Sequence, residues 1–427
     1  MKKVLLCLCM LILVGCQSSV KESESQNIPP TKENCVLKEW KYLMFNGDGH
    51  DAGYYYTRHQ ENGPSLLSYY DYATKQEVVL CNQPECKHED ETCPAYLFGV
   101  GLSQMLFVYK EHLYMIESHG LSLNSLGETV EEGSGIIQRD QDGQNKKIVM
   151  RLDTGYQFEQ GNFVLADNYL YIPIVKYQNI ETGKNETFQV DSEKYLARID
   201  FNTGKVEKLF DMKDKHILGV DGRKIIMDSA IYSEDPQKYL DQKDFNKYDK
   251  IILNSRFQYA IYDIDTQDTK TIPTNDEEIG TYYQNKIYSI KNNTLYALDF
   301  KTQQKDKILD LPKSDQYYIS NILNQYIIIE KWDDQFLGSY KVSLENPKLE
   351  ELKQYTRSPK EPVTILSQNE KQLLVIYDRE GKEEKTWAGT MQYETKKEYI
   401  GLISIDDYLN NQRNYQQIKT LSEKRFS

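Results

Sequence analysis

The chain has 427 residues, a formal net charge of −13, 39% hydrophobic residues and 27% charged residues. The acidic balance argues against nucleic acid as a partner, because such binding depends on Lys and Arg groups that displace phosphate counterions. It also argues against broad contact with anionic lipid surfaces. The composition is polar but not that of a disordered chain. Its 34 Tyr favour strands, in which the ring packs and the hydroxyl reaches water.

Residues 1–15 have the pattern of a signal peptide. Two lysines precede an unbroken apolar run over residues 4–14, which ends in Gly-Cys and a polar stretch. At about 1.5 Å per helical residue, this run is too short to cross a hydrocarbon core of about 30 Å. Removing residues 1–15 takes away two lysines, which leaves a mature charge of −13 − 2 = −15.

The residues before Cys16 resemble the lipobox of bacterial lipoproteins. The resemblance implies cleavage before Cys16, diacylglyceryl transfer to its sulfur, and a lipid-anchored place on the extracytoplasmic face of the cell membrane. Two acyl chains matter because each buried CH₂ contributes about 0.8 kcal/mol and one chain anchors only marginally. A signal peptide with an incidental Cys is the alternative. Residues 17–34 lack an apolar period, so we predict a flexible tether over residues 16–34.

Short apolar strands return along the rest of the chain at intervals of about forty to sixty residues. Each contains one of seven anchor residues, which are Tyr54, Leu113, Leu170, Ile225, Ile287, Ile327 and Leu373. A repeat of this length, made of strands, is what a four-stranded propeller blade requires, with loop insertions adding the excess. We expect residues 231–250 to be one such insertion, with a helical turn.

A second signature, apolar-Asp-apolar-any-Thr, recurs four times after the anchors. Its copies lie at residues 70–74, 199–203, 262–266 and 298–302. We expect a β-hairpin at each copy, in which the Asp and Thr side chains bond nearby backbone N–H groups. Residues 138–147 occupy the equivalent place in the second unit. Their Asp-x-Asp-Gly stretch indicates a turn and not a calcium loop, because no further acidic ligands follow at loop spacing.

At these repeated hairpins the chain resembles the YWTD-like β-propellers of bacterial lipoproteins, which are similar to TolB-type and low-density-lipoprotein-receptor-type propeller domains. The resemblance covers roughly residues 40–420 and supports fold more than function. We predict an all-β fold, a single propeller of about seven four-stranded blades over residues 35–427, with six or eight blades as alternatives. Two packed β-sandwiches are the runner-up, but they predict a break near the middle that the sequence lacks.

Beyond the signal peptide and Cys16, the remaining cysteines are Cys35, Cys81, Cys86 and Cys93. Three of them share a polar loop, residues 80–96, with His88. The loop resembles an element of such lipoproteins for which no role is assigned. Because it has little apolar content, we expect cross-links to take the place of a core.

Three interpretations of this loop remain open. Disulfides among the four cysteines are favoured by the oxidising side of a membrane. Alternatively, the three loop cysteines and His88 form a Cys₃His set suited to structural zinc, although C-x₄-C-x-H-x₄-C is not a standard zinc-finger spacing. The third interpretation is free thiols in a host that lives without oxygen.

The sequence offers no catalytic signature. It contains no G-x-S-x-G elbow, no H-E-x-x-H and no glycine-rich phosphate loop, and none of its 65 acidic residues is singled out as a catalytic pair. We therefore expect a propeller that binds or scaffolds a cell-envelope polysaccharide, peptide or protein. The alternatives are a propeller enzyme acting on glycans, as hydrolase or lyase, and a metal- or thiol-dependent sensor or stability protein centred on the Cys/His loop.

Overall fold

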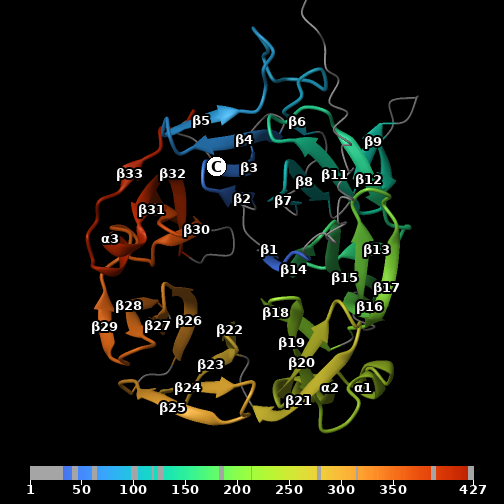
Figure 1. The fold of residues 1–427 in the computed structure, drawn as a ribbon, viewed down its shortest axis with the longest axis vertical. Helices are drawn as coiled ribbons and strands as arrows, with labels where there is room; N and C mark the ends of the chain where they lie inside the picture. The colour runs from blue at the N-terminus through green and yellow to red at the C-terminus, as the bar shows by residue number, and fades with distance from the viewer. Residues whose placement is uncertain are drawn as a thin grey trace, which may run out of the picture. The chain divides into compact units, whose positions relative to one another are not determined.

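Each of the seven anchor residues lies on the second of four strands that follow one another along the chain and form an antiparallel blade, and the seven blades stand around a central axis (Figure 1). The prediction of a seven-bladed β-propeller is therefore confirmed. The computed structural model describes residues 32–40, 47–59, 65–97, 104–117, 120–123, 129–181, 187–212, 214–276, 280–313, 316–333, 335–385 and 391–421. Cys16 and most of the predicted tether lie outside these ranges. Within them, no helix has the length and apolar character that crossing a membrane demands.

The blades follow one another along the chain, each running from its innermost to its outermost strand. Blade 1 has β2 (Gly47–His50), β3 (Gly53–Arg58), β4 (Ser65–Asp71) and β5 (Gln76–Val79), with β6 (Tyr96–Leu97) beside β4. Blade 2 has β7 (Gln104–Tyr109), β8 (His112–Glu117), β11 (Gly135–Asp140) and β12 (Lys147–Arg151). Blade 3 has β14 (Gly161–Ala166), β15 (Tyr169–Glu181), β16 (Thr187–Asp200) and β17 (Val206–Asp211), with β13 (Tyr156–Phe158) beside β15.

The remaining four blades keep the same order. Blade 4 has β18 (Lys215–Asp221), β19 (Lys224–Ile231), β20 (Arg256–Asp263) and β21 (Thr269–Asp276). Blade 5 has β22 (Thr281–Tyr283), β23 (Lys286–Lys291), β24 (Thr294–Asp299) and β25 (Lys305–Asp310). Blade 6 has β26 (Gln316–Leu323), β27 (Tyr326–Trp332), β28 (Phe336–Ser343) and β29 (Leu349–Leu352). Blade 7 has β30 (Thr364–Gln368), β31 (Gln372–Lys385), β32 (Met391–Ser404) and β33 (Gln416–Gln417).

Apolar clusters fill the spaces between neighbouring blades. The described residues form seven such clusters, and each is shared by two adjacent blades. Ile225 and Met227 face the cluster between blades 3 and 4, whereas Ile226, between them on β19, faces blade 5. Because successive side chains of a strand point to opposite faces, a strand covered on both faces is apolar throughout. This explains why the second strands stand out in the sequence.

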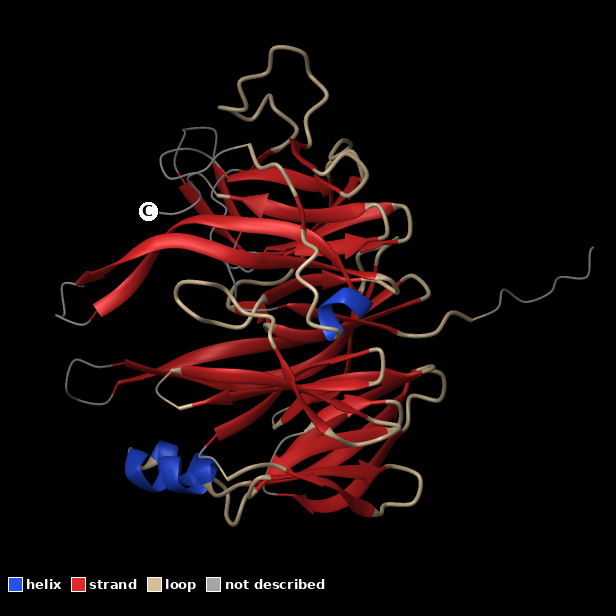
Figure 2. Ribbon diagram, turned by 90° about the vertical axis from the view of Figure 1, so that its left-hand side faces the viewer, coloured by secondary structure: helices blue, strands red, loops and turns tan. Residues whose placement is uncertain are grey.

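Insertions gather where the second strand of a blade connects to the third. They are the hairpin β9 (Gly120–Leu123) with β10 (Thr129–Glu132), the helices α1 (Gln237–Asp241) and α2 (Phe245–Leu253), and the long extensions of β15–β16 and β31–β32. In an antiparallel blade these connections share one face of the ring, and Figure 2 shows long hairpins and helices projecting from the same side. The helices confirm the predicted insertion at residues 231–250, with more helix than a single turn. A third helix, α3 (Ile405–Leu409), precedes β33.

The two ends of the folded part lie in different blades. β1 (Val36–Trp40) does not join blade 1 but pairs antiparallel with β14, as an additional innermost strand of blade 3. The C-terminal segment closes the ring: Lys419 forms a parallel bridge with Gln76 on β5, and the N–H of Leu421 donates to Glu77 Oε2 at 2.8 Å. Glu77 is 3% exposed and also bonds the Tyr56 hydroxyl. We call residues 418–421 the C-terminal clasp.

The four Asp-Thr signatures form the turns between the third and fourth strands, as predicted. In each turn the Asp Oδ1 accepts the N–H groups two and three residues later, the acceptors being Asp71, Asp200, Asp263 and Asp299. At three of them the Thr hydroxyl accepts another backbone N–H. Residues 138–147 form the corresponding turn between β11 and β12.

We expect Asp299→Ala to lower the free energy of unfolding by about 1 kcal/mol, because it removes two hydrogen bonds from backbone N–H groups. The backbone N–H groups of Thr302 and Lys301 donate to the Asp299 carboxylate at 2.9 and 2.8 Å. These hydrogen bonds hold the pKa of Asp299 below its usual value. The carboxylate therefore contributes stability above its unfolded pKa of about 4, and loses it as pH falls through the lower folded pKa. Denaturant titrations of Asp299→Ala and Asp299→Asn at neutral and acidic pH check this. The side-chain oxygen of Asp299→Asn can still accept these hydrogen bonds. If this variant loses as much stability as Asp299→Ala, the turn hydrogen bonds are not the cause.

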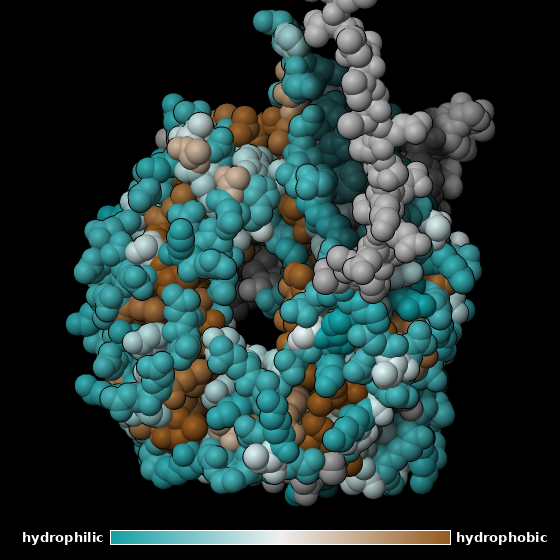
Figure 3. All heavy atoms as spheres, viewed as in Figure 1, coloured by the Kyte–Doolittle hydropathy of each residue, from teal (hydrophilic) through white to brown (hydrophobic). Residues whose placement is uncertain are grey.

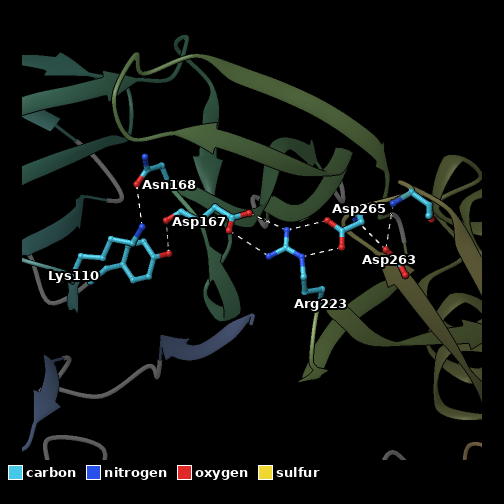
Figure 4. Close-up of polar contacts among 8 residues, drawn as sticks. Lys110, Asp167, Asn168, Arg223, Asp263 and Asp265 are labelled. Atoms are coloured by element: carbon cyan, nitrogen blue, oxygen red, sulfur yellow. Dashed lines mark hydrogen bonds and ion pairs between the residues drawn. The ribbon is translucent and has the colours of Figure 1, made fainter. Parts of the chain in front are cut away.

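Polar bridges join blades 2, 3 and 4 at the ends of their turns (Figure 4). The guanidinium of Arg223 lies between Asp167 and Asp265, with 2.9 Å ion pairs to both carboxylates. These two hydrogen-bonded acids raise the pKa of Arg223. The hydroxyl of Tyr109 donates to the Asp167 carbonyl at 2.6 Å. Loops of three blades are thereby tied together at the face opposite the insertions.

Candidate functional site

The Cys/His loop connects β5 to β6, so it leaves the outer edge of blade 1 and returns beside β4. Within it the chain reverses sharply: Glu85 and His88 both have a φ of 60°, an uncommon left-handed conformation for residues other than glycine. Hydrogen bonds across the loop fix these turns, among them Cys93 N–H to the Asp90 carbonyl at 3.1 Å and Gln83 Nε2 to the Thr92 carbonyl at 3.0 Å. The backbone therefore folds the loop around a common centre.

The donor atoms of four side chains meet at this centre. The ligating atoms of Cys81, Cys86, His88 and Cys93 all lie within 4.8 Å of one another, and His88 Nδ1 is 3.2 Å from Cys93 Sγ. Tetrahedral zinc with Zn–S bonds of about 2.3 Å places its sulfur ligands about 3.8 Å apart. Three soft sulfur donors and one imidazole at this spacing suit a metal ion, so the cluster could hold one.

The two ends of the cluster have different surroundings. Cys93 is 2% exposed, and burial raises the pKa of its thiol to about 12. The Cys86 thiol accepts the backbone N–H of His88, which lowers its pKa. The cluster thus reaches from the interior to the surface, where an ion can enter.

The loop packs against the next blade. Cys93 and Ala95 share an apolar cluster with Leu106 and Met115 of blade 2. Arg139 on β11 reaches the loop from the same side, with Nη1 donating to the Pro94 carbonyl at 2.9 Å. Burial lowers the pKa of this guanidinium, whereas the charge of Glu117 and, when its thiol is ionised, that of Cys93 raise it. The loop is therefore part of the interface between blades 1 and 2.

Cys35 lies apart from the three cysteines of the loop. No sulfur–sulfur bond joins the four cysteines in the structure, and Cys35 packs in the cluster between blades 3 and 4, whereas the other three lie beside the cluster of blades 1 and 2. The disulfide interpretation stays a prediction. The N–H of Cys35 donates to the Gly222 carbonyl at 2.8 Å. Its position at the start of β1, beside a turn of blade 4, explains why this cysteine does not join the loop.

A second feature is the central channel, a cavity of about 650 Å³ lined by the innermost strands of all seven blades and by β1. Figure 3 shows an opening at the centre of one face, with hydrophilic residues around much of its rim. Neutral polar and tyrosine residues form the largest group in the lining, which also contains apolar residues; the group includes Asn162, Tyr282, Tyr283, Asn321, Ser367 and Gln368.

Bulges direct extra side chains towards this channel. The register of the innermost strand slips by one residue in blades 4, 6 and 7, and the additional residues, Leu218, Ser320 and Leu366, all line the channel. A bulge leaves one residue unpaired and changes where its side chain points. The lining of the channel therefore depends on irregularities in the first strands, and no sequence pattern marks these three residues.

Charged groups in the channel lining come from β1 and β2. They are Lys38, Glu39 and Asp48. Asp48 forms an ion pair with Lys38 and accepts the N–H groups of Val108 at 2.8 Å and Gly49 at 3.0 Å. These contacts tie β1, β2 and β7 together at the channel wall, so Asp48 has a structural role there.

Comparison with known proteins shows the fold and not the function. No model of a protein family matches the chain, and no curated protein matches it. A puromycin-hydrolysing peptidase from Mycobacterium tuberculosis is similar in structure, with a TM-score of 0.52 and 9% identity over 90% of this chain and 53% of that one. This chain thus spans about half of the peptidase's length.

Two further solved structures show weaker likeness. An oligogalacturonate lyase in complex with manganese has a TM-score of 0.42 and 10% identity, over 80% of this chain and 86% of that one. TolB from Acinetobacter baumannii has a TM-score of 0.33 and 13% identity, over 82% and 76%. These comparisons leave the functional assignment to the side chains of this protein.

Proposed function

We propose that this protein is a lipid-anchored, extracytoplasmic β-propeller that binds a cell-envelope polysaccharide in its central channel. Support for the anchor comes from the signal-peptide pattern and the Gly-Cys that ends its apolar run at Cys16. Support for binding comes from the channel. Its size, about 650 Å³, is within the range of ligand sites, about 300–1,000 Å³.

The neutral, hydroxyl- and amide-rich lining is the observation that carries the choice of ligand. Tyr282 and Tyr283 pack partly between blades and also line the channel, and Asn321 and Gln368 offer amides on neighbouring innermost strands. Sugars combine many hydroxyl groups with an apolar ring face, so they match such a surface. A strongly charged ligand would find few partners there, because Lys38 and Asp48 already pair with each other.

Filling the channel should abolish this binding. Ser320 is an exposed bulge residue of β26 that lines the channel, so we expect Ser320→Trp to weaken binding at least tenfold by occupying the space with an indole. Binding of the form lacking residues 1–16 to isolated cell-envelope polysaccharide measures this. Glu345→Trp, on an exposed turn of the same blade, is the matched control. Equal binding by both variants would exclude the channel as the site, and no binding by the unaltered protein would exclude the polysaccharide.

We also propose that Cys81, Cys86, His88 and Cys93 bind a structural zinc ion. Three thiolates and an imidazole are typical zinc ligands, and a site with four protein ligands leaves no position open for a substrate. The ion would cross-link the polar part of the loop, whose end at Cys93 and Ala95 packs in the apolar cluster with blade 2. The role of this centre is therefore to stabilise the loop and not to catalyse a reaction.

A further inference from the structure

A buried positive charge lies beside the Cys/His loop. Arg139, on the third strand of blade 2, is 6% exposed. Its Nη1 donates to the Pro94 carbonyl at 2.9 Å and to the Gly143 carbonyl at 2.8 Å. Its Nε is buried and has no hydrogen-bond partner among the residues that the structure describes. The guanidinium is thus only partly satisfied by neutral carbonyl groups.

No acidic side chain neutralises this guanidinium in the described part of the chain. The ion pairs found there do not include Arg139. Glu117, the carboxylate whose charge acts on it most, pairs instead with Arg151 at 3.1 Å. An ion that is buried without a counter-charge is strongly destabilising. Another negative group is therefore needed near Arg139.

The metal centre has the required charge. One Zn²⁺ with three thiolates and a neutral imidazole carries 2 − 3 = −1, which a single guanidinium neutralises. Pro94, whose carbonyl Arg139 holds, directly follows the ligand Cys93. The buried sulfur of Cys93 therefore comes from blade 1, and the buried guanidinium of Arg139 comes from the adjoining blade 2.

We propose that Arg139 is a positioning residue of the metal centre, supplying from blade 2 the positive charge that balances the anionic zinc–thiolate cluster of blade 1. The inference rests on the proposed zinc site and extends it, because it assigns a role to a residue outside the ligand set. It makes zinc affinity and the blade 1–blade 2 interface interdependent. Zinc release leaves the Arg139 charge unbalanced at that interface, and loss of Arg139 weakens the hold on zinc.

Zinc affinity tests whether loss of Arg139 weakens zinc binding. We expect Arg139→Met, which keeps the apolar length of the side chain, to weaken zinc binding by about 10–100-fold, as losses around metal ligands typically do. Arg139→Lys keeps the charge and should recover much of that affinity. Arg198→Met, which alters an arginine on the third strand of the next blade that pairs with Glu207, is the matched control. The full chain, purified in detergent, is titrated with a competing chelator.

The effect of zinc release on the Arg139 charge is tested in a variant that lacks two of the zinc ligands. In the background Cys86→Ser, Cys93→Ser, the cluster charge is gone, so Arg139→Met should no longer lower the unfolding midpoint and should raise it. The same lowering in both backgrounds would show that Arg139 merely packs, and would overturn the proposal. Unchanged zinc affinity in Arg139→Met would overturn it as well. Absence of zinc from the unaltered protein would refute the zinc site itself, and this inference with it.

Discussion

Cys93→Ser is expected to remove bound zinc and to lower the free energy of unfolding by on the order of 3 kcal/mol. Zinc binding contributes roughly 10 kcal/mol or more to isolated zinc-binding peptides, and we expect a loop already held between two blades to depend on part of that. Cys93 is the buried ligand and shares the apolar cluster of blades 1 and 2. Disorder of the loop should therefore spread to that interface. Metal analysis and denaturant unfolding of the purified protein measure both effects.

Cys35→Ser is the control for this experiment. Cys35 is also buried, and burial raises the pKa of its thiol to about 11, but it lies between blades 3 and 4. Its replacement should leave the zinc content unchanged. If no metal is present and Cys81, Cys86 and Cys93 all react with an alkylating reagent in the native protein, the structural zinc is refuted. Loss of all titratable thiols at these three positions without reductant would mean a disulfide instead.

The second large effect concerns Cys16. Cys16→Ser should release the protein from membranes or leave it as an uncleaved precursor, because the serine cannot accept the diacylglyceryl group through a thioether. Two or more acyl chains make anchoring stable, so the shift between membrane and soluble fractions should be nearly complete. Fractionation combined with labelling of acyl groups measures it. Ser18→Ala, two residues away in the predicted tether, controls for a substitution near the cleavage site, and acyl labelling that persists in Cys16→Ser would contradict the anchor.

The sequence was informative where both faces of a strand are covered. The anchors Ile225, Ile327 and Leu373 belong to continuous apolar runs because their neighbours face the adjoining blade. The Asp-Thr turns were also predictable, since each depends on side-chain bonds to the backbone within a few residues. The uneven spacing of the anchors follows from insertions such as α1 and α2 between β19 and β20.

Features that depend on distant partners left no local pattern. β1 joins β14 in blade 3 through pairs such as Trp40 with Gly161, and nothing near Trp40 distinguishes this from pairing within blade 1. The Cys/His set was predictable because its ligands lie in one short loop. Arg139 was not, because its position beside Pro94 arises only when blades 1 and 2 pack together. Most channel residues were missed because bulges in the first strands decide which side chains enter, and a bulge leaves no local pattern.

The C-terminal clasp sets the order in which the ring can be completed. Leu421 and Glu77 are 344 positions apart, so this contact requires nearly the whole chain to be present. During synthesis the blades can form one after another, because each packs mainly against its neighbours in sequence. Residues 418–421 complete the seam between blades 7 and 1, where Ile418 joins the apolar cluster that these two blades share. A chain that ends before them lacks these contacts at the seam.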